Sequence, residues 1–146
     1  MPWTTTYHNL SSANLNLSPP GGSFMTVATE MNHVPKAVLT PGTKDYLQID
    51  QDFSTVGQGP WDWYQSISVS GGSQVLWVRT NVPMQVWMMG YSPNWNYVIN
   101  SGGVPTDWGK TYEGESPSTT FNKMKVQFSA VHTHTQVSIN IVFEDT

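Results

Sequence analysis

Tryptophan is the residue type in this chain whose positions say most about its chemistry. Seven tryptophans occur in 146 residues, and several stand beside proline, asparagine, aspartate or glycine. The clearest segments are Trp61-Asp62-Trp63-Tyr64, Trp95-Asn96-Tyr97 and Thr106-Asp107-Trp108-Gly109. Such neighbours are typical of turns, and an indole in a turn presents an apolar face and an N–H donor to the surface. The pattern predicts noncovalent binding through exposed aromatic rings.

Two classes of ligand suit such rings. Amphipathic aromatic side chains are favoured at the headgroup level of a membrane, where asparagines and nearby charges would bind the headgroup. Sugar rings also stack on tryptophan and tyrosine while asparagine and aspartate bind their hydroxyls, so a lectin-like carbohydrate-binding module is the alternative. A third hypothesis is a structural protein whose aromatic residues are buried between subunits. The residues alone leave all three open.

Catalytic and metal-binding motifs are missing or incomplete. His132-Thr133-His134 would put two imidazoles on one face of a strand, which is half of a metal site, but no third ligand can be identified. The acidic pairs Asp50 with Asp52 and Glu113 with Glu115 do not match an EF-hand loop. The sequence has no Gly-x-Ser-x-Gly elbow and no phosphate-cradling glycine motif. We therefore expect no enzymatic activity, no metal and no cofactor.

The charge balance limits the classes of binding partner that we expect. Six Lys and Arg residues against ten Asp and Glu residues give a formal net charge of −4. The electrostatic attraction that dominates binding to nucleic acids and to anionic membranes is therefore missing. We expect no nucleic-acid partner, and a membrane ligand with a neutral or zwitterionic headgroup. The given N-terminus lacks a signal-peptide pattern and no apolar run is long enough to span a bilayer, which predicts a soluble protein.

Apolar residues recur with a period of two between turn signals, as expected for half-buried strands. The clearest strand is 136–144, and 124–130 should pair with it as an antiparallel hairpin. Thr80 to Pro83 is expected to be a turn, because proline cannot donate to a ladder. The other predicted strands are Trp3 to His8, Asn14 to Leu17, Phe24 to Thr29, Lys36 to Leu39, Tyr46 to Ile49, Trp63 to Val69, Gln74 to Arg79 and Met84 to Tyr91.

Prolines and glycines spread along the chain leave no window for a long helix. Length and pattern together predict one all-β domain, residues 1–146, folded as an antiparallel β-sandwich. The longest loop is expected between residues 100 and 118. Tryptophan and phenylalanine within predicted strands, namely Trp77, Trp87 and Phe128, are expected to pack in the core.

Three segments resemble the aegerolysin family. Residues 3–12, Trp3-Thr4-Thr5-Thr6-Tyr7-His8-Asn9-Leu10-Ser11-Ser12, are similar to the opening of that family, where a tryptophan, a strand and a His-Asn type turn follow in order. Residues 36–42 leading to Leu47-Gln48-Ile49 resemble its strand, proline turn and strand, and Gly57-Gln58-Gly59 resembles the glycine step that follows. The resemblance covers about the first half of the chain.

This resemblance implies a small acidic β-sandwich that binds specific membrane lipids through exposed aromatic residues and acts extracellularly at a target-cell membrane. It also implies a larger perforin-like partner in a two-component pore-forming, in some cases insecticidal, toxin. Trp3 matches the family's N-terminal tryptophan. The cysteine and the Trp-Asp-Cys-Pro-Trp stretch of many members have no equivalent here. The candidate ligand-binding residues are Trp3, Trp61, Trp63, Tyr64, Trp95, Tyr97 and Trp108.

Overall fold

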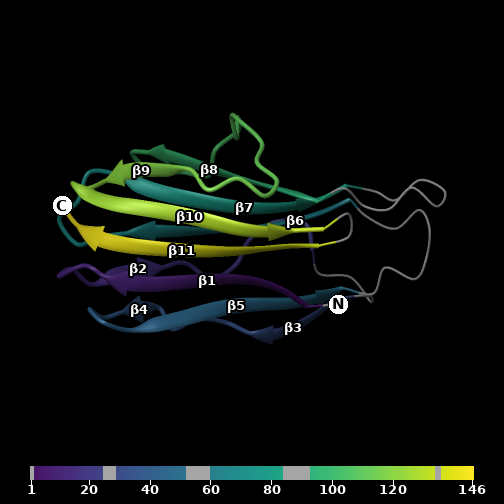
Figure 1. The fold of residues 1–146 in the computed structure, drawn as a ribbon, viewed down its shortest axis with the longest axis horizontal. Coiled ribbons are helices and arrows are strands. Elements are labelled where there is room, and N and C mark those ends of the chain that lie inside the picture. Colours follow the sequence, from purple (N-terminus) through teal and green to yellow (C-terminus); the bar gives the residue numbers. More distant parts are fainter. Residues whose placement is uncertain (1, 25–28, 52–59, 84–92, 134–135) are drawn as a thin grey trace.

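The computed structural model describes residues 2–24, 29–51, 60–83, 93–133 and 136–146. In these ranges the chain is built from β-strands joined by turns and loops (Figure 1). The strands are β1 (Pro2–Leu10), β2 (Leu15–Leu17), β3 (Thr29–His33), β4 (Val38–Leu39), β5 (Lys44–Gln51), β6 (Trp61–Ser68), β7 (Val75–Val82), β8 (Asn94–Asn100), β9 (Ser118–Phe121), β10 (Met124–His132) and β11 (Val137–Asp145).

The strands form two sheets that pack face to face, so the predicted β-sandwich is confirmed (Figure 1). Sheet A has the order β3-β5-β1-β11-β10-β9, and sheet B has the order β4-β2-β6-β7-β8. The predicted hairpin of β10 and β11 is present. One part of the prediction needs correction: β1 and β11 pair in parallel at the centre of sheet A, while every other strand pair in the described ranges is antiparallel.

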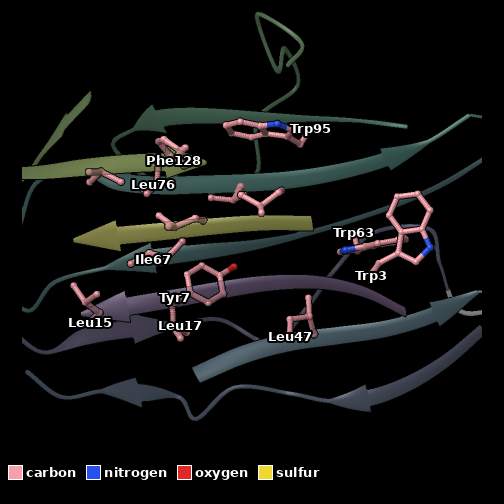
Figure 2. Packing of buried hydrophobic residues seen from close by; sticks show 14 of the residues in the cluster. Trp3, Tyr7, Leu15, Leu17, Leu47, Trp63, Ile67, Leu76, Trp95 and Phe128 are labelled. Atoms are coloured by element: carbon pink, nitrogen blue, oxygen red, sulfur yellow. The ribbon is translucent and has the colours of Figure 1, made fainter. Parts of the chain in front are cut away.

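The core follows from the alternation of side chains along each strand. In β6, Trp61, Trp63, Gln65 and Ile67 are buried while the residues between them face outward. Figure 2 shows Trp3 of β1 beside Trp63, and their rings meet edge to face at a centroid distance of 5.7 Å. Large rings from both sheets thus fill the space between them.

A buried hydrogen bond also joins the two sheets. The Tyr7 hydroxyl on β1 donates to Gln65 Oε1 on β6 over 2.8 Å. Because Tyr7 is fully desolvated, its pKa is raised well above its usual range, and the phenol stays neutral and able to donate. Gln65 in turn donates from Nε2 to the Ser18 carbonyl. The buried polar side chains of Tyr7 and Gln65 are therefore paired.

Two sequence expectations about local structure are wrong, and one strand was missed. Thr80 to Val82 continue β7, because Val82 is fully buried opposite Trp61. Trp95-Asn96-Tyr97, expected in a turn, belongs to strand β8 at the edge of sheet B. Strand β9 was not expected. The predicted strand Met84 to Tyr91, which holds Trp87, lies outside the described residues, as does most of the predicted strand Phe24 to Thr29.

Replacing Trp3 with alanine tests the role of this ring in packing. The side chain is 1% exposed, so we expect Trp3→Ala to lower the free energy of unfolding by about 3 to 5 kcal/mol. Urea denaturation followed by far-ultraviolet circular dichroism measures this loss. The control is Leu10→Ala at the exposed end of the same strand, which should change stability by less than about 0.5 kcal/mol. Equal stability of the two variants would contradict the core position of Trp3.

Candidate functional site

The structure divides the seven candidate aromatic residues into buried and partly exposed groups. Trp3, Trp61, Trp63 and Trp95 are at most 2% exposed. The expectation that the tryptophans of residues 61–63 and 95 lie in surface turns is wrong, because they occupy the inward positions of strands. Tyr64, Tyr97 and Trp108 are partly exposed and are the candidates with ring surface open to a ligand.

The loop that follows β8 is fixed to sheet B by hydrogen bonds from three side chains. Residues 101–117 leave the β8 edge as the projecting green segment in Figure 1, which confirms the predicted long loop. Asn96 Nδ2 donates to the Lys110 carbonyl over 2.8 Å, and Trp95 Nε1 donates to the Glu113 carbonyl over 2.8 Å. Asn100 Nδ2 donates to the Gly103 carbonyl over 3.0 Å. Both limbs of the loop are therefore anchored.

The anchored loop places Trp108 over the outer face of sheet B. Its ring centroid lies 5.6 Å from that of Tyr64, and the Arg79 guanidinium carbon lies 5.6 Å from the Trp108 centroid. Trp77 also contacts Tyr64, with a distance of 5.9 Å between the two ring centroids. Asp62 binds Arg79 through Oδ2 and Nε at 3.2 Å. We call these five residues, Asp62, Tyr64, Trp77, Arg79 and Trp108, the Trp108 cluster.

The cluster combines aromatic faces with a balanced ion pair. The Asp62 and Arg79 side chains are 21% and 24% exposed, so the pair is accessible from solution and carries no net charge. In the described part of the chain, neither the Tyr64 hydroxyl nor the Trp108 indole N–H has a hydrogen-bond partner. Such a surface can hold an apolar or cationic group against its rings and offers donors to polar atoms beside them.

Gly21 allows close packing of the Tyr64 ring against the backbone. A Cβ atom on Gly21 would lie 3.0 Å from Tyr64 Cε1, closer than almost all real Cβ contacts. The Gly21 and Tyr64 backbones also exchange two hydrogen bonds of 2.9 Å, one in each direction. The absence of a side chain at position 21 therefore lets the Tyr64 ring lie close to the sheet.

Tyr97 belongs to a separate aromatic group. Its ring stacks on Phe128 of β10 at 4.6 Å and on Tyr112 of the loop at 5.6 Å. Lys110 Nζ lies 4.9 Å from the Tyr112 ring centroid. Desolvation, hydrogen bonding with Tyr97 and the charge of Glu115 together raise the pKa of Tyr112. This stack closes the edge of the sandwich between β8 and β10, so Tyr97 serves packing there.

Sequence reasoning missed two members of the Trp108 cluster. Trp77 was expected in the core. It is only 8% exposed, yet it lies on the outer face of β7, where its Nε1 donates to Asn100 Oδ1 over 3.0 Å. Arg79 was not considered. The signal was present, because strict alternation with Leu76 and Val78 places residues 77 and 79 together on the outward face.

The described ranges hold neither a metal-ligand cluster nor a membrane-spanning helix. These ranges contain no group of three or more histidine, cysteine, aspartate or glutamate side chains placed to hold a metal ion. His132 Nε2 instead contacts the Pro93 carbonyl at 3.0 Å, and His134 lies outside the described residues. No helix with the length and apolar character needed to cross a bilayer occurs in the same ranges.

The fold places the chain in the class of β-sandwich proteins, which are built from two packed sheets. Among solved structures, the chain is similar to the crystal structure of the lipid-binding protein Nakanori, with a TM-score of 0.68. The match covers 97% of this chain and 70% of that chain, at 10% sequence identity, and therefore shows a shared fold. No model of a known protein family matches the sequence, and no curated protein matches it. Membership of the aegerolysin family stays a prediction.

The anchoring of the loop can be tested at Asn96, which is 3% exposed. Asn96→Ala leaves the Lys110 carbonyl without its donor, so we expect a loss of about 1 to 2 kcal/mol in the free energy of unfolding. Trypsin should also cleave after Lys110 faster in this variant. Asn94→Ala, on the same strand and the same face, is the control. Unchanged cleavage in Asn96→Ala would mean that this hydrogen bond does not hold the loop.

Proposed function

We propose that this chain binds membrane lipids with a zwitterionic headgroup and that the Trp108 cluster makes the contact. The observation that carries the proposal is the cluster itself. It combines the partly exposed rings of Tyr64 and Trp108 with an accessible, charge-balanced pair of Asp62 and Arg79. Aromatic faces attract quaternary ammonium groups, and a guanidinium binds phosphate oxygens. A headgroup carrying one charge of each sign matches both parts.

Two further observations support lipid binding. The chain shares its fold with Nakanori, which is a lipid-binding protein. The net charge of −4 disfavours membranes whose attraction would be mainly electrostatic, leaving ring burial and headgroup contacts as the source of affinity. Each ring that enters the headgroup layer contributes about 1 to 3 kcal/mol.

The finer part of the proposal concerns pore formation. The aegerolysin resemblance of the first half of the chain suggests that a larger perforin-like protein perforates the membrane after this chain has bound its lipid. Such pairs include insecticidal toxins. The sequence offers no evident long membrane hairpin of alternating apolar residues. We therefore expect the chain alone to bind vesicles without releasing an enclosed dye.

Vesicle co-sedimentation tests the lipid proposal. We expect binding to sugar-free phosphatidylcholine or sphingomyelin vesicles and much weaker binding to phosphatidylglycerol vesicles, which lack the ammonium group. Trp108→Ala should weaken binding by about 5- to 150-fold, the equivalent of burying one ring. Tyr46→Ala is the matched control, because Tyr46 is an exposed aromatic residue outside the cluster, 38% accessible on sheet A.

Several outcomes would contradict lipid recognition or its assignment to the Trp108 cluster. If no vesicle composition pellets the protein, lipid binding fails as the primary function. If Trp108→Ala and Tyr46→Ala weaken binding equally, the Trp108 cluster is not the site. If glycans bind and free sugar competes while bare vesicles do not bind, the cluster serves the lectin-like alternative, in which a sugar ring stacks on Trp108 or Tyr64.

A further inference from the structure

The outer face of sheet A carries a concave site, away from the Trp108 cluster. It is a hollow of about 280 Å³ between strands β5, β1, β11 and β10. Its polar lining consists of six side chains: Thr4, Thr6, Lys44, Ser129, Ser138 and Asn140. We call it the Lys44 hollow.

The strand register explains why these side chains meet. Thr6 of β1 lies opposite Asn140 of β11, and Asn140 lies opposite Ser129 of β10. All three occupy outward positions of adjacent strands, so they form one row across the sheet. Small side chains in the middle of the row leave a depression, and Lys44 on β5 stands at its border.

Beside Ala130, Val131 and Ile139, the lining offers hydrogen-bonding groups that the protein leaves open. In the part of the chain that the structure describes, the hydroxyls of Thr4, Thr6 and Ser138 have no hydrogen-bond partner within the protein. Lys44 likewise forms no ion pair with any described residue. One uncompensated ammonium group and several hydroxyl donors therefore face the same space.

We propose that the Lys44 hollow binds the phosphate group of a phosphate monoester. An ammonium group, hydroxyls and the amide of Asn140 can all donate to the few oxygens of a phosphate. A neutral sugar would favour a carboxylate acceptor and an aromatic platform, and the described lining contains neither. Tyr46, opposite Thr6 in the register, stacks on His33 at 4.1 Å instead.

The phosphate can belong to a soluble ester or to a lipid headgroup. The hollow and the Trp108 cluster lie on opposite outer faces of the sandwich, with the core between them. A flat bilayer that contacts one face cannot contact the other. When the Trp108 cluster is bound to a membrane, the Lys44 hollow faces the solution, or a second membrane.

Nuclear magnetic resonance titration tests the proposal. Glycerol 3-phosphate is the soluble probe, and phosphatidylcholine vesicles containing phosphatidic acid are the lipid probe. We expect saturable shifts of the backbone amides of Thr4, Thr6 and Ser138 with glycerol 3-phosphate. Lys44→Gln should weaken this binding by about tenfold or more, because a charge-assisted contact is lost. Lys44→Arg should retain most of it.

Lys125→Gln is the control, since it removes the same charge from the outer face of sheet A outside the hollow. If phosphatidic acid strengthens binding over pure phosphatidylcholine vesicles in a Lys44-dependent way and the soluble ester does not bind, the site is supported and the phosphate is that of a lipid. No saturable shift with either probe overturns the proposal. So does equal weakening by Lys125→Gln and Lys44→Gln. Binding of Lys44→Gln to pure phosphatidylcholine vesicles reports on the Trp108 cluster separately.

Discussion

The structure depends on burying one face of every strand between two sheets. Because successive side chains point to opposite faces, this constraint assigns each aromatic residue to the core or to the surface. On β6, Trp61 and Trp63 therefore point into the core, and Tyr64 points to the outer face. A slip of one residue would exchange these roles, so the register of β6 against β7 decides which rings can meet a ligand.

The same constraint links the fold to the candidate site. The inward residue Trp95 and the covered residue Asn96 of β8 both donate hydrogen bonds to loop carbonyls, so one edge strand anchors the loop. The anchored loop then sets Trp108 against Tyr64 and Arg79. The ordered conformation of the loop is therefore stabilised by side chains that also belong to the sandwich. A preorganised ring loses less freedom when it binds than a ring on a mobile chain.

Much of the fold could be predicted from the sequence. Period-two patterns located β1, β5, β6, β10 and β11, because their inward residues are apolar with few exceptions. Strand β8 was missed because Pro93, Asn94 and Asn96 are typical of turns, whereas Asn96 in fact reaches into the loop above it. The parallel pairing of β1 with β11 joins the two ends of the chain, and no local pattern reports such a contact.

The candidate site was predicted less completely. Turn-like neighbours suggested exposure for six aromatic residues, and the family resemblance added Trp3. Burial, however, depends on partners far away in the sequence, as the contact of Trp3 with Trp63 shows. Tyr64 and Trp108 are brought together across 44 positions by the fold of the loop. Neither Arg79 nor the Lys44 hollow has a motif, since each arises from the register of neighbouring strands.

The central claim is that the Trp108 ring meets the lipid headgroup. Tryptophan fluorescence in the presence of phosphatidylcholine vesicles with brominated acyl chains tests it most directly, because bromine quenches indoles only at short range. We predict quenching of the unaltered protein that is clearly reduced in Trp108→Phe, with both proteins folded and both pelleting with the vesicles. Equal quenching of the two proteins would contradict the claim.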